Sequence, residues 1–390
     1  MSDCDTSSVV AWLVDGARSA PSPQQVLEEM SVRLCECGVP LWRVEVFVRT
    51  LHPEVVGRRF QWRHGNEVAV SMATYNVSPT EESRKSFVEH LCAGSSSIRI
   101  RLHRDVFIEF PLLTELRAEG AKDLLAMPLV FTKGDVHAAI FTTREPEGFT
   151  DEQVAGLEAI VKPLARIAEV RALQRTATNL LDTYVGSRAG ERILAGQIRR
   201  GHTESINAAI WLSDMRGFTS LSDQVAPKIM IGILNDYFDC QVPSILKHGG
   251  EVLKFMGDGL LAMFPIENQE DEKGICAEAL AAGLEARARI AEFETTEVED
   301  VKQIRFGLAL HVGEVLYGNI GGGNRLDFTC IGPAVNLAAR LEKIAAELGR
   351  TIVTSSAFGC HFNSQLTTIG EFTVRGFGGK QMVFGLTDED

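Results

Sequence analysis

Two aspartates occupy positions where their carboxylates could hold metal ions. Asp214 lies in the run SDMRGFT, after an apolar segment and before an expected helix, and Asp258 lies between two glycines at an expected hairpin tip. Taken alone, the first is most often a helix cap and the second a turn former. If the two strand ends converge, these carboxylates are the hard oxygen ligands that a pair of divalent cations beside a polyphosphate requires.

The residues after Asp214 suit phosphate binding. Gly217 lets the backbone approach a ligand closely, and Phe218 and Thr219 would open a helix, where exposed N–H groups favour phosphate oxygens. Many helices begin after a glycine, so this stretch is a weak signal by itself. It supports the interpretation of the two carboxylates as a metal and phosphate site.

Strands and helices in the second half of the chain would position these residues. Apolar periodicity and turn residues predict alternating helices and strands, with little indication of a parallel sheet. They also predict that the strand region 303–319 is interrupted near Gly313. The expected elements are a strand over 208–213, a helix over 227–248, two short strands within 251–264, a helix over 272–293, a strand pair within 303–319, a turn at 321–324, a helix over 333–348, and strands at 351–353 and in the last segment.

The first half of the chain predicts a smaller sheet and a long helix. Helical periodicity covers much of 9–34, and strands are expected at 42–50, 123–130 and 136–142. Thr150-Asp151-Glu152-Gln153 has the form of a capping box, and an apolar stripe continues from it to about Asp182. Such a helix either lies on its own domain or begins a dimeric connector. The Gly- and Arg-rich stretch 184–201 is typical of a junction.

Composition limits the class of protein. The 390 residues suggest two domains, possibly three, and the net charge of −13 argues against a nucleic-acid binder. No apolar run approaches the roughly 20 residues of a membrane span, and the first residues do not resemble a secretory leader. The eight cysteines are scattered, and Cys35 and Cys37 form a lone C-x-C that is a poor zinc signal. We therefore expect a reduced, cytoplasmic protein.

Four segments of the second half resemble the catalytic domain of class III nucleotidyl cyclases, which make cyclic AMP or cyclic GMP. They are AIWLSDMRGFTS, GEVLKFMGDGLLAMF, RFGLALHVGEVLYG and TCIGPAVNLAARLE, and their order and spacing fit the family from about residue 206 to 386. The resemblance implies a ferredoxin-like catalytic fold. It also implies roles for individual residues: Asp214, Asp258 and the carbonyl of Met215 in metal binding, Lys254 and Thr329 in base selection, Asn336 in orienting the ribose, Arg340 in stabilising the transition state, and Arg305 and Arg375 in contacting the triphosphate.

Elementary chemistry agrees with these roles. Cyclisation requires attack of the ribose 3′-hydroxyl on the α-phosphorus, and two divalent cations, Mg²⁺ or Mn²⁺, would assist it. Lys254 can only donate hydrogen bonds, which suits adenine N1, whereas the Thr329 hydroxyl could serve adenine or guanine. Many adenylate cyclases have Asp at the Thr329 position, and Thr there resembles the subgroup that contains the soluble, bicarbonate-responsive enzymes. The favoured function is an adenylate cyclase; a guanylate cyclase and a non-catalytic nucleotide-binding or dimerising module are the alternatives.

In this family each active site forms between two catalytic domains. Because this chain carries both sets of residues in one such domain, the resemblance implies a homodimer with two equivalent sites that acts on ATP. We expect no nucleic-acid partner and no membrane span. Asn336 and Arg340, four residues apart after Pro333, would share one helix face.

Residues 24–171 resemble a GAF domain, a sensory fold with a six-stranded antiparallel sheet and flanking helices. The similarity rests on LAMPLV at 125–130, the turn at 133–135 and GFTDEQVAGL at 148–157. Its ligand cannot be predicted, since lone histidines and a plain thiol are more often structural than ligating; the candidates are His52, His64, His90, His103, His137 and Cys92. The expected organisation is α+β: a segment 1–23, a GAF-like regulatory domain 24–171, a helical linker 172–203 and a cyclase domain 204–390.

Overall fold

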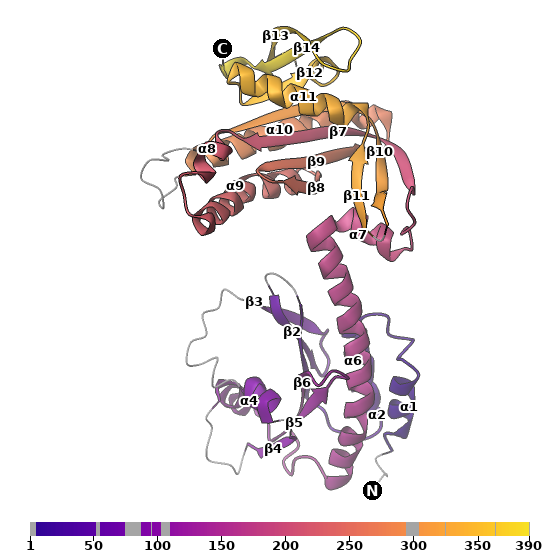
Figure 1. Ribbon diagram of the computed structural model, residues 1–390. Helices are drawn as coiled ribbons and strands as arrows, with labels where there is room; N and C mark the ends of the chain where they lie inside the picture. Colours follow the sequence, from indigo (N-terminus) through magenta and orange to yellow (C-terminus); the bar gives the residue numbers. More distant parts are fainter. Residues whose placement is uncertain are drawn as a thin grey trace. The chain divides into compact units, whose positions relative to one another are not determined.

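The computed structural model describes residues 5–51, 55–74, 87–94, 96–102, 110–293, 304–323, 325–362 and 364–389 (Figure 1). The chain separates into two compact units, Met1–Leu180 and Leu181–Asp390. Both combine helices with sheets, so the predicted α+β class is confirmed. Among the helices of the described residues, none is long and apolar enough to cross a membrane.

The first unit is built on a six-stranded antiparallel sheet. Its strand order is β3-β2-β1-β6-β5-β4, and helices cover both faces. Apolar side chains of α1, α2 and α6 pack on one face, and those of α4 and α5 on the other. The strands are β1 (Arg43–Arg49), β2 (Val55–Arg63), β3 (Ala69–Thr74), β4 (Ile98–Arg101), β5 (Asp123–Val130) and β6 (Val136–Thr143); the helices are α1 (Ser7–Val14), α2 (Pro23–Glu36), α4 (Phe87–Gly94), α5 (Pro111–Ala118) and α6 (Asp151–Val185).

This sheet has the strand number and pairing expected for the GAF-like domain, although the GAF assignment itself stays a prediction. The capping box is present: the N–H of Gln153 donates to Thr150 Oγ1, and the N–H of Thr150 donates to Gln153 Oε1. His52, His103 and the side chain of Cys92 lie outside the described residues. Within the part of the chain that is described, no three His, Cys, Asp or Glu side chains gather as a metal site.

The second unit is built on an eight-stranded sheet. Its order is β13-β14-β12-β10-β7-β9-β8, with β11 paired to β10. Helices α9 and α10 pack on one face through a core around Trp211, and α11 packs on the other. The strands are β7 (Thr203–Met215), β8 (Glu251–Met256), β9 (Gly259–Ile266), β10 (Phe306–Gly322), β11 (Arg325–Ile331), β12 (Ile352–Ser355), β13 (Leu366–Thr373) and β14 (Lys380–Leu386); the helices are α7 (Ser187–Leu194), α8 (Phe218–Ser222), α9 (Pro227–Lys247), α10 (Glu272–Glu292), α11 (Pro333–Leu348) and α12 (Ser356–Gly359), with short 3₁₀ turns η1 (Gln269–Asp271) and η2 (Thr387–Glu389).

The predicted break near Gly313 is wrong. Strand β10 continues through this residue and pairs with β7 without interruption, Gly313 lying opposite Ala208. A Cβ at position 313 would lie 3.2 Å from the Cβ of Ala334 in α11. Glycine therefore lets α11 approach the strand closely, and it does not interrupt the sheet.

Candidate active site

The carboxylates of Asp214 and Asp258 meet at one end of the second sheet. Asp214 is the penultimate residue of β7, and Asp258 lies in the turn between β8 and β9. The turn is held beside Asp214 because β9 pairs with β7, with Leu260 opposite Ser213. The two carboxyl groups lie close enough for Asp258 to raise the pKa of Asp214. The two strand ends thus converge, which is the condition that the metal-site hypothesis requires.

The environment of Asp214 disfavours its charged form. Burial, the neighbouring Asp258 and then Glu342 raise the pKa of Asp214 from an ordinary value of 3.8 to about 7, while Arg216 opposes the shift. Two carboxylates this close repel each other when both are ionised. A divalent cation between them would remove that repulsion, and oxygen donors are the ligands that Mg²⁺ and Mn²⁺ prefer. The donor set therefore fits a hard divalent cation.

The residues that follow Asp214 present backbone to the same end of the sheet. The side chain of Met215 is buried in the core, so its carbonyl is the group that it could offer to a cation. Gly217 has φ +80° and forms the N-cap of the short helix α8. Phe218 packs against the core, and Thr219 is exposed. Gly217 is required for its left-handed backbone alone, since a Cβ there would meet nothing within 4 Å.

An ion pair that we did not predict ties this strand end to α11. Nη1 of Arg216 lies 2.5 Å from Oε1 of Glu342, and both side chains are largely buried. The guanidinium passes directly over Gly307 of β10, where a Cβ would lie 1.6 Å from Nη2. Both charged residues lie inside the motif segments quoted above, and this position was the only sign in the sequence that they belong to the site. Their pairing depends on packing between segments 126 residues apart.

Lys254 and Thr329 belong to a second group of side chains. Nζ of Lys254, on β8, lies 3.1 Å from Oδ2 of Asp327, which is two residues before Thr329 on β11. Thr329 is 4% exposed, and its Oγ1 has no hydrogen-bond partner in the described part of the chain. A buried hydroxyl without a partner is costly unless a ligand supplies one. Asp327 was not among the predicted site residues.

Helix α11 adds Asn336 and Arg340 to this second group. Ala334 and Ala338 pack in one core cluster with residues of β11, and this packing turns Asn336 and Arg340 outward, one helical turn apart. Both side chains are exposed. Among the described residues, no carboxylate lies within ion-pair distance of Arg340. Its guanidinium is therefore available to a ligand.

The two remaining predicted arginines, Arg305 and Arg375, have exposed side chains. The carbonyl of Arg305 accepts a hydrogen bond from the N–H of Arg216 at 2.8 Å, so its backbone is near Asp214, but its side chain is exposed. Arg375 is exposed in the loop between β13 and β14, and β13 forms the edge of the sheet opposite to β8. Neither arginine contacts a metal-site carboxylate within one chain, in the region that the structure describes.

Within one chain the sheet separates Asp214 from Thr329. Asp214 pairs with Gly307 of β10, whereas Thr329 pairs with Gly318 of the same strand. These partners are eleven residues apart, which corresponds to about 36 Å along the strand at the usual rise per residue. Over the described residues, no hydrogen bond or ion pair links the carboxylate pair to Lys254, Thr329, Asn336 or Arg340.

The second unit is similar in sequence to known proteins. Residues 202–388 match the family model of the adenylate and guanylate cyclase catalytic domain. A terminal-differentiation-specific adenylate cyclase of Dictyostelium discoideum is 32% identical over 43% of this chain and 8% of its own length. An adenylate cyclase of Anabaena cylindrica is 30% identical over 41% of this chain and 32% of its own length. The chain thus spans about a third or less of these curated relatives.

Solved structures of cyclases are also similar to this chain. The adenylyl cyclase CyaB from P. aeruginosa is 27% identical, with a TM-score of 0.42, over 48% of this chain and 96% of that one. The guanylyl cyclase Cya2 is 28% identical, with a TM-score of 0.40, over 47% of this chain and 93% of that one. These similarities cover about half of the present chain.

Proposed function

Because residues 202–388 match the family model of the adenylate and guanylate cyclase catalytic domain, we propose that the protein converts ATP into 3′,5′-cyclic AMP and pyrophosphate. In this step the 3′-hydroxyl loses its proton, its oxygen bonds to the α-phosphorus, and the bond from that phosphorus to the pyrophosphate oxygen breaks. The observation that carries the proposal is the convergence of Asp214 and Asp258, which supplies oxygen donors where the triphosphate must be neutralised.

The metal ligands in this proposal are the carboxylates of Asp214 and Asp258 and the carbonyl of Met215. Two divalent cations bound there would lower the pKa of the 3′-hydroxyl and balance the charge of the triphosphate. The N–H groups at the start of α8, from Gly217 to Thr219, would bind phosphate oxygens beside them. Together these groups position the reacting phosphate, which is the main task of the protein in phosphoryl transfer.

The second group of side chains would recognise the nucleoside. Lys254 would donate to adenine N1, and the unpartnered Oγ1 of Thr329 would accept from the adenine N6 amino group. Asn336 would orient the ribose. Arg340, which faces no carboxylate of the described residues, would stabilise the charge on the phosphoryl oxygens, and loss of such a donor typically costs about 3–4 kcal/mol.

A complete site then needs two chains. The carboxylates of one protomer would meet Lys254, Thr329, Asn336 and Arg340 of another, as the family resemblance implies. The strand registers support this for Thr329, whose partner on β10 lies eleven residues from that of Asp214. A symmetric homodimer would have two such sites. Arg305 and Arg375 are weaker candidates, and we assign them to triphosphate binding only by family resemblance.

Cyclase assays with ATP or GTP, each with Mg²⁺ or Mn²⁺, test the proposed reaction. We expect cyclic AMP from ATP with at least one cation, no product without divalent cation, and a much lower rate with GTP. Asp258→Asn should abolish activity, whereas Asp239→Asn, an exposed aspartate on α9, should not. Cyclic GMP as the main product would instead indicate that Thr329 selects guanine. No product with any combination would favour a non-catalytic module.

We also propose that the first unit regulates catalysis through α6, the 35-residue helix that ends at Val185. A helix of this length can pack against the same helix of a second protomer and so connect the two chains. A chain beginning near Tyr184 should differ from the full chain in cyclase rate or in dimerisation. If both properties are unchanged, the regulatory role is excluded.

A further inference from the structure

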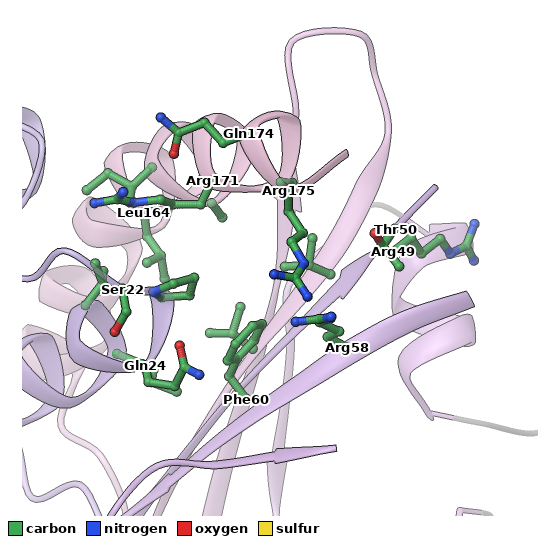
Figure 2. A pocket seen from close by; sticks show the side chains of 18 of the residues that line it. Ser22, Gln24, Arg49, Thr50, Arg58, Phe60, Leu164, Arg171, Gln174 and Arg175 are labelled. Atoms are coloured by element: carbon green, nitrogen blue, oxygen red, sulfur yellow. The ribbon is translucent and has the colours of Figure 1, made fainter. Parts of the chain in front are cut away.

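A cavity of about 450 Å³ lies inside the first unit (Figure 2). The start of α2, strands β1 and β2, and the middle of α6 form its walls. Phe60 and Val46 are paired across β1 and β2, and their side chains belong to the same core cluster as Leu164 of α6. This volume is in the range of natural small-molecule sites.

Arginines gather in this cavity, whose other lining residues are partly apolar and partly polar. Arg58 precedes Phe60 by two residues on β2, so it projects from the same face of the sheet towards α6. Arg175 comes from α6, and Figure 2 shows the guanidinium groups of Arg58 and Arg175 turned towards each other. Arg49 and Arg171 also line the cavity. Two facing guanidinium groups, those of Arg58 and Arg175, thus lie at a cavity of small-molecule size.

Within the described part of the chain these charges have no acidic partner. No carboxylate of the described residues lies within ion-pair distance of the four arginines, whereas Arg59, the next residue after Arg58, lies 3.6 Å from Glu45. Nε of Arg58 is buried without a hydrogen-bond partner in the described structure. Burial and the adjacent Arg175 lower the pKa of Arg58. An anion between the two guanidinium groups would supply the missing partner, since arginine binds carboxylate and phosphate oxygens with paired N–H groups.

We propose that this cavity binds an organic anion, with its carboxylate or phosphate group between Arg58 and Arg175 and its apolar body against Phe60 and Leu164. The arginines and the apolar wall together favour a ligand that is both anionic and apolar. An inorganic anion would leave the apolar wall uncovered, and a neutral molecule would leave the guanidinium groups unpaired. The site is separate from the cyclase residues, and its occupancy does not depend on the proposed reaction.

Calorimetric titration of the full chain tests this site. The probes are 1-naphthyl phosphate, 1-naphthoate, inorganic phosphate and the neutral 1-naphthol. We expect at least one of the two naphthyl anions to bind more tightly than inorganic phosphate or 1-naphthol, and the stronger of the two identifies the preferred head group. Arg58→Met and Arg175→Met should each weaken that binding about 10- to 100-fold, as loss of a charge-assisted hydrogen bond does. Arg117→Met, an exposed arginine on α5, should leave it unchanged.

Thermal unfolding without ligand separates loss of the site from loss of the fold. Removing one of two facing positive charges relieves repulsion, so Arg58→Met and Arg175→Met should unfold at the same temperature as the unmodified protein or higher. The proposal is overturned if neither naphthyl anion binds, if 1-naphthol binds as tightly as the anions, or if folded arginine variants bind them as well as the Arg117→Met control does.

Discussion

At the scale of single residues, Asp214 is held in a site that opposes its charge. Its pKa of about 7 in the folded protein lies above its ordinary value of 3.8. Between these values the folded protein binds more protons than the unfolded chain does, so this residue makes the metal-free protein less stable as pH rises from about 4 to 7. Above pH 7 the full cost is present, and below pH 4 it is absent.

Asp214→Asn should therefore stabilise the metal-free protein at pH 8 and have little effect at pH 4. We expect a gain of roughly 1–3 kcal/mol, below the full equivalent of the pKa shift because the site is partly solvated. Mg²⁺ or Mn²⁺ should raise the unfolding temperature of the unmodified protein but not that of the variant. Thermal unfolding with and without cation measures both effects. A variant that is less stable at pH 8 without cation would contradict this account.

Base recognition is also a property of single residues. Lys254→Glu replaces a donor with an acceptor and places it beside Asp327, so ATP turnover should fall by about 100-fold or more. Lys228→Glu, an exposed lysine on α9, is the matched control and should retain activity. Product analysis with both nucleotides measures the change. Full ATP activity in Lys254→Glu would refute the assigned contact with adenine.

Sequence alone could place Asp214 and Asp258 at the ends of strands, because both stand in short motifs whose local elements are set by nearby residues. Asp327 and Glu342 could not be predicted in the same way. Each acts on a residue from a distant segment, Lys254 or Arg216, and these contacts arise only when β8 meets β11 and β7 meets α11. Motif spacing does not contain that information.

At the scale of elements, the ion pair between Arg216 and Glu342 joins β7, the strand that carries Asp214, to α11. In the proposed dimer, α11 serves the other active site through Asn336 and Arg340. Within one chain, this ion pair therefore links the strand that carries Asp214, which would serve one site of the dimer, to the helix that carries Asn336 and Arg340, which would serve the other site. Gly307 is what allows this, because any side chain there would occupy the position of the guanidinium.

Gly307→Ala should displace Arg216 and leave the largely buried Glu342 without its partner. Breaking a buried ion pair in this way costs about 3–5 kcal/mol of folding stability. Since Arg216 opposes the raised pKa of Asp214, the acidic limb of the pH–rate profile should move to higher pH. Gly274→Ala on α10, where a Cβ meets nothing within 4 Å, is the control. Unchanged stability and an unchanged pH profile in Gly307→Ala would exclude this role.

The elements themselves were largely predictable. The helix over 333–348 is observed with the same limits, because proline at its first position and a glycine after its last residue fix both ends. The error at Gly313 has a physical cause. Glycine is a turn signal in sequence, but here it is selected by the close approach of Ala334 from α11, which only the folded sheet reveals.

At the scale of the whole molecule, the account depends on two chains sharing each site. Asp258 and Arg340 belong to different halves of the proposed site, so a chain lacking one can still contribute the other. Asp258→Asn and Arg340→Ala should each be inactive alone. In a mixed dimer, one of the two sites would combine two intact halves.

Cyclase activity after mixing these two inactive variants is the most direct test. If subunits exchange freely, half of the dimers are mixed and each has one intact site, so about 25% of the unmodified activity should return. A mixture of Asp214→Asn with Asp258→Asn, both in the metal half, should stay inactive. The account is contradicted if the first mixture stays inactive although native mass spectrometry shows mixed dimers, or if Arg340→Ala alone retains full activity.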